Sequence, residues 1–130
     1  MWARDGASQA IGMALERVEP GAARLSMTIE PRHVNGHGIC HGGYIFALAD
    51  SAFAFACNTT GEASVAQHCS VTFVRPGRLG ERLVASAWEQ HRAGRSGVYD
   101  VRVETPEGEL VALFRGHSRT TGGRIEGVPP

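Results

Sequence analysis

The sequence predicts an α+β domain in which an antiparallel sheet wraps around one buried helix. Three observations support this: apolar and polar residues alternate in most segments, turn residues separate these segments, and residues 44–58 are apolar on nearly every side. A helix that is apolar all round must be enclosed by protein, and a twisted sheet is the element available to enclose it. The 130 residues suit a single domain over residues 1–130.

The first part of the chain is expected to contain a lead-in, two strands and a glycine-rich loop. These segments are, in order, residues 1–10, 13–19, 22–30 and 32–43. The second strand shows the clearest pattern, because Leu25, Met27 and Ile29 alternate with polar residues at the period of a half-buried strand. The glycines of the loop exclude a regular element there.

A central helix is expected over residues 44–58, because this segment is rich in Ala, Leu and Phe and contains neither glycine nor proline. The run that ends at Gly61 stops it. Four antiparallel strands follow, divided by turns that contain glycine or proline. They are expected over residues 63–74, 81–92, 98–104 and 110–119, with a flexible tail over 122–130.

Such a sheet leaves its edge strands and its outer face uncovered. Exposed edges present unpaired N–H and C=O groups, which proteins commonly cover by association. We therefore expect a homo-oligomer in which edge strands pair across a dimer.

Composition excludes several classes of function. The 13 basic and 13 acidic residues cancel, so no nucleic-acid partner is expected. All the basic residues are arginine, which excludes a lysine Schiff base and a P-loop lysine. The longest apolar stretch, residues 44–57, contains Asp50 and has about 14 residues, too few to cross a bilayer. No membrane association is therefore expected.

The cysteines and histidines indicate neither a disulfide framework nor a metal site. The three cysteines are an odd number without CxxC spacing, and free thiols indicate a reducing, cytoplasmic compartment: Cys40, Cys57 and Cys69. No signal peptide is recognisable at the N-terminus. His33, His37 and His41 recur every four residues, but the glycines among them break any helix. We therefore expect no metal and no cofactor.

Two features of residues 35–51 indicate chemistry. His41, Gly42 and Gly43 lie at the expected start of the helix, where free N–H groups and the positive end of the helix dipole can stabilise an oxyanion. Asp50 is the only ionisable carboxylate in an apolar helix, so it must be paired, neutralised or used. Taken alone, Asp50 fits a buried hydrogen-bonding residue equally well.

The spacing of these two features predicts a composite site. Gly42 and Asp50 are eight residues apart, which is about 12 Å along a helix. One reacting carbonyl can hardly touch both groups of the same chain. We therefore expect the Gly42 N–H from one protomer and Asp50 from the facing protomer at a dimer interface.

The run from Asn35 to Asn58, NGHGICHGGYIFALADSAFAFACN, resembles the signature of hotdog-fold acyl-CoA thioesterases. It is most similar to the phenylacetic-acid-degradation (PaaI-type) branch, which segments 73–77, 97–100 and 112–116 also match. The resemblance implies a hotdog fold, with five or six antiparallel strands around a central helix, and a homotetramer built from dimers. It also implies hydrolysis of phenylacetyl-CoA or ring-hydroxylated phenylacetyl-CoA to the free acid and CoA.

The resemblance further implies roles for individual residues. The carboxylate at the position of Asp50 is catalytic in that family, and the glycine at the position of Gly42 supplies the oxyanion N–H. Whether Asp50 acts as nucleophile or as general base stays open. Ser51, where relatives usually carry Thr, is expected to position water or the carboxylate. Asn35 is expected to hold the loop, the water or the thioester, and His41 to orient the glycine turn.

Several further residues are weaker candidates. Arginine pairs well with phosphate, which makes four arginines candidates for CoA contacts: Arg75, Arg78, Arg95 and Arg115. The aromatic residues of the helix fit an aryl pocket, although such spacing is more often core: Tyr44, Phe46, Phe53 and Phe55. A nucleophilic Cys40–His41 pair is disfavoured, since adjacent loop residues rarely reach that geometry. His68 and Cys69 are expected in the core.

Two other functions stay open at this level. A hotdog enoyl-thioester hydratase or dehydratase would use His41 and Asp50 to move a proton. A non-catalytic acyl-CoA-binding module would leave the thioester intact, with Asp50 purely structural. The carboxylate combined with a glycine oxyanion turn argues against the non-catalytic module, and an assay of thiol release against loss of enoyl absorbance distinguishes the hydratase.

Overall fold

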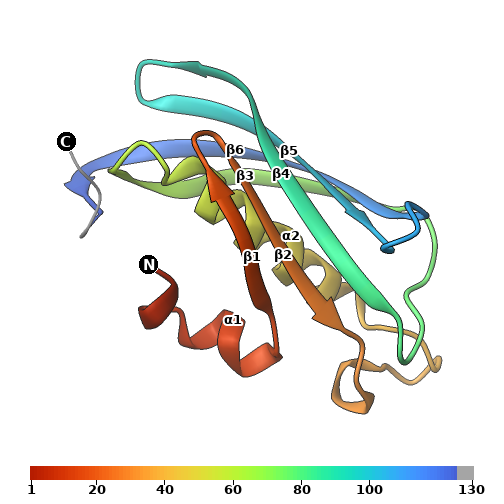
Figure 1. Ribbon diagram of the computed structural model, residues 1–130. Coiled ribbons are helices and arrows are strands. Elements are labelled where there is room, and N and C mark those ends of the chain that lie inside the picture. The colour runs from red at the N-terminus through yellow and green to blue at the C-terminus, as the bar shows by residue number, and fades with distance from the viewer. Residues whose placement is uncertain (126–130) are drawn as a thin grey trace.

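The computed structural model, which describes residues 1–125, is a six-stranded antiparallel sheet curved around one long helix (Figure 1). The short helices η1 (Trp2–Arg4) and α1 (Gly6–Ile11) come first, then β1 (Ala14–Glu19), β2 (Ala22–Thr28) and η2 (Pro31–His33). The remaining elements are α2 (Gly42–Cys57), β3 (Glu62–Phe73), β4 (Arg82–Ala93), β5 (Ser96–Glu104) and β6 (Leu110–Arg124). The α+β class and the order of elements predicted from the sequence are confirmed.

The strand order β1-β2-β4-β5-β6-β3 makes β1 and β3 the two edges of the sheet. All pairs are antiparallel. Strand β3 pairs with β6 along almost its whole length, and most of its residues are exposed. A long exposed edge of this kind is open to pairing with another chain.

Helix α2 packs on the concave face of the sheet against every strand (Figure 1). Its side chains Leu48 and Phe53 are completely enclosed with residues of β2 and β5 such as Leu25 and Val103. Gly116 of β6 permits this packing, because a Cβ there would lie 2.8 Å from atoms of the Phe53 ring. Burial against the sheet, rather than helix propensity, is what holds α2 in place.

The sheet does not enclose α2 completely. One stripe of the helix, with residues spaced four, three and four apart, is half-buried or exposed: Gly43, Ala47, Asp50 and Ala54. This spacing places the four residues on one face. The prediction that protein encloses the helix therefore holds for the side that faces the sheet, and the stripe is not fully covered by the described residues.

Two predictions for the strands are wrong in part. Strand β6 continues to Arg124, which pairs with Glu62, so the first residues of the predicted tail belong to the sheet; residues 126–130 of that tail lie outside the described chain. His68 is exposed rather than in the core, and Cys69 is half-buried. His68 and Cys69 are neighbours on β3, so their side chains point to opposite faces, and Cys69 is the one that packs against the core.

No helix within residues 1–125 combines the length and the apolar character needed to cross a bilayer.

Candidate active site at the start of helix α2

The backbone before α2 presents an unpaired N–H at Gly42. His41 is the N-cap residue, and its Nδ1 accepts a hydrogen bond from the Gly43 N–H at 2.8 Å. The Tyr44 N–H donates to the carbonyl of His41 at 3.0 Å. Between these two, the Gly42 N–H has no hydrogen-bond partner in the described residues. It is therefore a free donor at the positive end of the helix dipole.

Two histidines hold this turn in place. The His41 N–H donates to the carbonyl of His33 at 2.7 Å. His33 is completely buried, and its Nδ1 accepts from the Glu30 N–H at 2.9 Å, so its Nε2 carries the proton and donates to Ile11 at 2.8 Å. In both rings, Nδ1 accepts a hydrogen bond from a backbone N–H. Across residues 1–125, His, Cys, Asp and Glu side chains form no group of three that could hold a metal ion.

A pocket of about 360 Å³ opens beside Gly42. Its walls come from the loop before α2, the first turn of α2 and the end of β3: Asn35, Ile39, Cys40, Gly42, Ile45, Phe73, Val74, Arg75 and Pro76. A Cβ at Gly42 would lie 3.0 Å from Cζ of Phe73, so glycine lets the ring approach the backbone closely. A mostly apolar wall that contains the free Gly42 N–H suits a carbonyl that carries an apolar group.

Asn35 holds the loop that forms one wall of the pocket. Its Oδ1 accepts from the His37 N–H at 2.9 Å and from the Ile39 N–H at 3.4 Å. Its Nδ2 makes no hydrogen bond with any described residue and is free to donate to a bound molecule. Of the three roles expected for Asn35, the contacts show the loop-holding one.

Asp50 lies two turns further along α2 and does not line this pocket. Its Oδ1 is 4.0 Å from Sγ of Cys69, a weak contact, and it forms no ion pair within the described chain. Burial raises the pKa of Asp50 above its ordinary value. A half-buried carboxylate without a compensating charge is a candidate for chemistry rather than for structure.

Ser51 points to a different neighbour. Its Oγ lies 2.8 Å from Oγ of Ser8 in α1, and Ser8 Oγ donates to Oδ2 of Asp5 at 2.7 Å. Consecutive helix residues do not share a face, so Ser51 turns toward α1 while Asp50 lies on the uncovered stripe.

Comparison with known proteins decides the family. Residues 37–112, more than half of the chain, match the thioesterase superfamily. The chain belongs to the thioesterase superfamily. It is 42% identical over 127 residues to the acyl-coenzyme A thioesterase PaaI of Escherichia coli K12, an alignment that covers 98% of this chain and 91% of the relative.

Solved structures of relatives confirm the hotdog fold for this superfamily member. The E. coli PaaI protein from the phenylacetic acid degradation operon matches with a TM-score of 0.94 over 96% of this chain and 91% of that one. The TT0310 protein of Thermus thermophilus is 41% identical, with a TM-score of 0.87 over 90% and 98% of the two chains. A Streptococcus mutans protein bound to acetyl CoA is 26% identical, with a TM-score of 0.83 over 88% and 92%.

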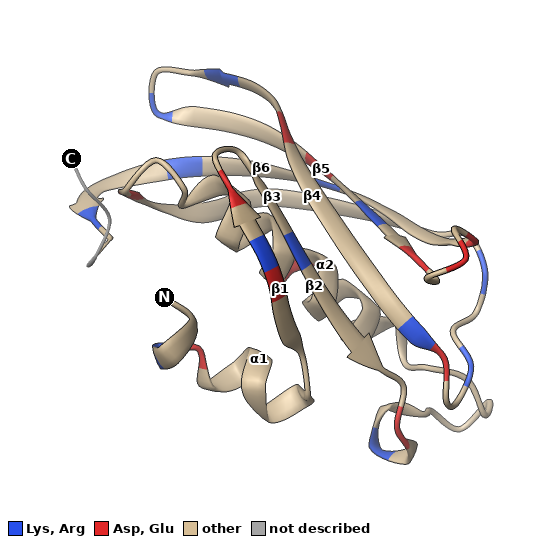
Figure 2. Ribbon diagram, in the orientation of Figure 1, with Lys and Arg blue, Asp and Glu red and all other residues tan. Residues whose placement is uncertain are grey.

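Two of the four arginines expected to contact CoA in this thioesterase-superfamily chain form ion pairs with carboxylates. Arg75 donates twice to Glu81, at 2.8 and 2.9 Å, and approaches Glu109 at 2.9 Å. Arg115 donates to Asp100 at 2.7 and 2.8 Å. Charged residues of both signs are dispersed over the strands and loops (Figure 2). Within the described chain, both arginines are therefore held in ion pairs with carboxylates.

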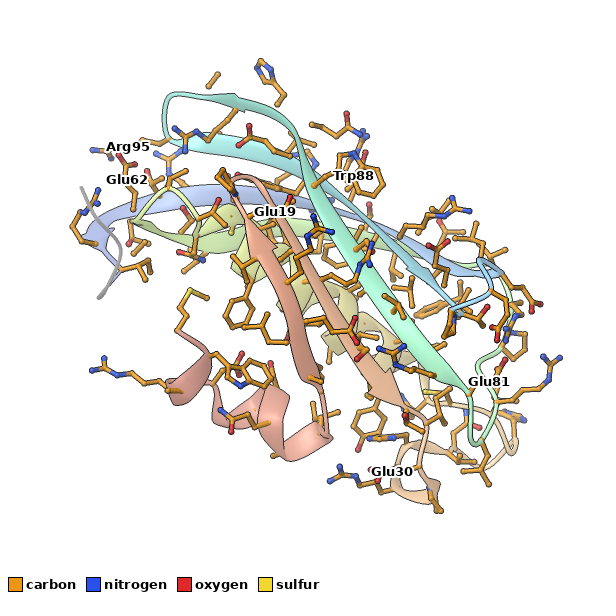
Figure 3. The ribbon with its side chains drawn as sticks, viewed as in Figure 1. Glu19, Glu30, Glu62, Glu81, Trp88 and Arg95 are labelled. Atoms are coloured by element: carbon orange, nitrogen blue, oxygen red, sulfur yellow. The ribbon has the colours of Figure 1, made fainter. Side chains whose placement is uncertain are left out.

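Arg78 and Arg95 form no ion pair with the residues that the structure describes. Glu81 marks the end of the sheet at which the pocket lies, because it is paired with Arg75 in the pocket wall. Figure 3 shows Arg95 at the opposite end of the sheet from Glu81. Arg78 follows the pocket wall in sequence, and its backbone N–H donates to Glu81 at 2.7 Å. Of the two arginines without an ion pair, Arg78 is the one closer in sequence to the pocket wall.

The Arg75–Glu81 pair makes stability depend on pH. Hydrogen bonds from Arg75 lower the pKa of Glu81 below its usual value of 4.5. A carboxyl whose folded pKa is lowered stabilises the fold above its unfolded pKa, and this contribution is lost as the pH falls through the folded value. Arg75→Ala is expected to lower the free energy of unfolding by about 1–2 kcal/mol at pH 7, with the difference from wild type shrinking below pH 4.5.

Urea unfolding of the two proteins between pH 7 and pH 3 measures this difference. Arg102→Ala is the matched control, because the pair that Arg102 forms with Glu104 is more exposed. An Arg75→Ala effect no larger than that of Arg102→Ala, or one that grows toward low pH, contradicts the assignment.

The aromatic residues of α2 lie in the core or pack against it, and none lines this pocket. The Phe53 ring packs against Phe114 at 5.8 Å, and Phe46 packs against the same ring at 5.4 Å. The aromatic ring at the pocket is Phe73, a site residue that the sequence analysis missed. The available signal was a large apolar residue immediately before Val-Arg-Pro-Gly at the end of a strand.

Burial also removes Cys40 from the candidates. Cys40 lines the pocket but is nearly inaccessible, and burial raises the pKa of its thiol to about 11. A thiol with such a pKa is not a thiolate near neutral pH, so Cys40 is a packing residue.

Proposed function

We propose that this chain is an acyl-CoA thioesterase that hydrolyses phenylacetyl-CoA and ring-hydroxylated phenylacetyl-CoA to the free acid and CoA. The observation that carries the proposal is the unpaired Gly42 N–H in the wall of an apolar pocket. The E. coli relative is named an acyl-coenzyme A thioesterase and belongs to a phenylacetic acid degradation operon, which supports the arylacetyl group. The Phe73 ring beside Gly42 supplies an aromatic surface for such a group.

The chemistry follows from two groups. The thioester carbonyl oxygen accepts the Gly42 N–H, which stabilises the negative charge that forms on this oxygen during attack. Asp50 accepts a proton from water as the water oxygen bonds to the carbonyl carbon. The C–S bond then breaks, Asp50 returns this proton to the sulfur, and CoA leaves as the thiol. The raised pKa of Asp50 favours proton acceptance, although direct attack by its carboxylate would give the same products through a mixed anhydride.

The two groups come together between protomers in this proposal. Asp50 lies outside the pocket of its own chain and on the uncovered stripe of α2, and the adjoining edge strand β3 is exposed. We therefore propose a homodimer in which β3 edges pair and Asp50 faces the partner's Gly42 turn. The PaaI-type resemblance extends this to a dimer of dimers in the cytoplasm, with Arg78 contributing to CoA binding.

Mixing two inactive variants tests the shared site. An Asp50→Asn protomer retains Gly42, and a Gly42→Pro protomer retains Asp50, so each mixed dimer contains one complete site. Random reassociation is expected to restore about a quarter of the wild-type activity, because half of the dimers are mixed and each has one working site of two. Unmixed samples of each variant, treated identically, are the controls. No recovery despite proven subunit exchange contradicts a site shared between protomers.

A substrate panel tests the reaction and the acyl group. Release of free thiol from phenylacetyl-, hydroxyphenylacetyl-, benzoyl- and straight-chain acyl-CoA is measured alongside the absorbance of an enoyl-CoA. We expect arylacetyl esters to give the highest kcat/KM. Faster cleavage of straight-chain esters would overturn the substrate and leave the reaction intact. Loss of enoyl absorbance without thiol release would instead identify a hydratase, and binding without turnover a non-catalytic module.

A further inference from the structure

The N-terminal segment is attached to α2 at two neighbouring points. The hydroxyl of Ser8 meets that of Ser51 at 2.8 Å, and the rings of Trp2 and Phe55 lie 5.9 Å apart. Ser51 and Phe55 are four residues apart, so they lie one above the other on one face of α2. The segment thus lies beside the turn of the helix that carries Asp50.

The direction of the hydrogen bonds can be assigned from the number of protons. The Asp5 carboxylate accepts twice from Ser8, from its N–H at 2.9 Å and from its Oγ–H at 2.7 Å. Ser8 has a single hydroxyl proton, which it donates in the hydrogen bond to Asp5. In the bond between the two serines, Ser51 is therefore the donor. The chain runs from Ser51 through Ser8 to Asp5.

This direction limits what Ser51 can do. Its only proton is directed at α1, so it is not available to water, to the thioester or to the Asp50 carboxylate. Ser8 is only 3% exposed, so water competes little for this bond, and the carboxylate at its end strengthens it. Helix α1 has six residues, too few to be stable alone, so its position depends on such contacts.

We propose that Asp5 and Ser8 are positioning residues of the active site, acting through Ser51 on the turn of α2 that carries Asp50. This inference rests on the proposed function. Fixing that turn holds the Asp50 carboxylate at its place relative to the partner's Gly42 turn. A displacement of about 1 Å at a reacting group can cost up to about 100-fold in rate. A loosened turn is therefore expected to lower kcat more than it raises KM.

Steady-state kinetics of Ser8→Ala, Ser51→Ala and the double variant test the proposal. Each is expected to lower kcat by about tenfold with KM changed less than about twofold. Because the two hydroxyls act through one bond, the double variant should lose no more than either single variant. Ser51→Thr, which keeps the hydroxyl, should restore kcat. Gln9→Ala is the control, since among residues 1–125 the Gln9 side chain bonds to the Trp2 carbonyl within the same segment and not to α2, so kcat should not change.

Three results would overturn the proposal. Losses that multiply in the double variant would show that the serines act independently. Normal kcat in Ser8→Ala with a low kcat in Ser51→Ala would assign Ser51 a direct role. A lower melting temperature with normal kcat would show a purely structural contact. In each of these three results the wild type still releases thiol, so the proposed function stands. A wild type that releases no thiol would instead refute the proposed function.

Discussion

Asp50→Asn is expected to lower kcat for thioester hydrolysis by about 10²–10⁴-fold while leaving the protein at least as stable as the wild type. Asparagine has the shape of aspartate but neither attacks a carbonyl nor accepts a proton from water. The site would keep its Gly42 N–H, so substrate binding should persist. Thiol release under single-turnover conditions measures the loss, and substrate titration measures the binding.

The expected stability follows from the direction of the pKa shift. Burial raises the pKa of Asp50 above its ordinary value of 3.8. The folded protein then holds this proton more tightly than the unfolded chain, so stability falls as the pH rises from that value through the folded pKa and stays reduced above it. Asparagine has no charge to bury and removes this penalty. Near neutral pH, Asp50→Asn should therefore unfold at the same or a higher urea concentration.

Asp100→Asn provides the matched control. Asp100 is paired with Arg115, and hydrogen bonds from Arg115 lower the pKa of Asp100. Its replacement is expected to reduce stability at neutral pH and to leave kcat near the wild-type value. Near-normal turnover in Asp50→Asn, or destabilisation of that variant by as much as Asp100→Asn, would contradict a catalytic Asp50.

Gly42→Pro is expected to lower kcat by about 10²–10³-fold relative to Gly42→Ala. Proline has no N–H, and its Cδ takes the place of the proton, so the oxyanion loses its donor. The helix should tolerate the change, since Gly42 is its first residue, where proline is favoured. The preceding His41 has φ −60° and ψ 130°, a conformation that residues before proline adopt.

Gly42→Ala isolates the effect of the N–H from that of added bulk. Both variants carry a Cβ that meets the Phe73 ring at 3.0 Å, and this half-exposed ring has room to move. Only the proline variant lacks the donor. Circular dichroism and the melting temperature check that α2 forms in both. Equal kcat in the two variants, with the fold intact, would remove Gly42 from the oxyanion site.

Much of the fold was predictable because local patterns and the packing agree. Alternation over residues 22–30 placed inside the same residues that the structure buries, Leu25, Met27 and Ile29. His68 was misplaced because adjacent strand residues point to opposite faces: Cys69 and Val71 pack against the core, so His68 points away from it. The contact between Ser51 and Ser8 joins residues that are 43 positions apart, so no local pattern could predict it.

The order of residues was sufficient to predict a sheet around one helix, the glycine turn at its start and the lone carboxylate within it. These depend on periodicity, helix-end chemistry and the rise per residue, which are local properties. The partners of the side chains depend on long-range packing. Arg75 pairs with Glu81 and Glu109, Ser51 contacts Ser8, and Phe73 lines the pocket. Such pairings arise when distant segments meet and exclude water, and neighbouring residues carry little information about them.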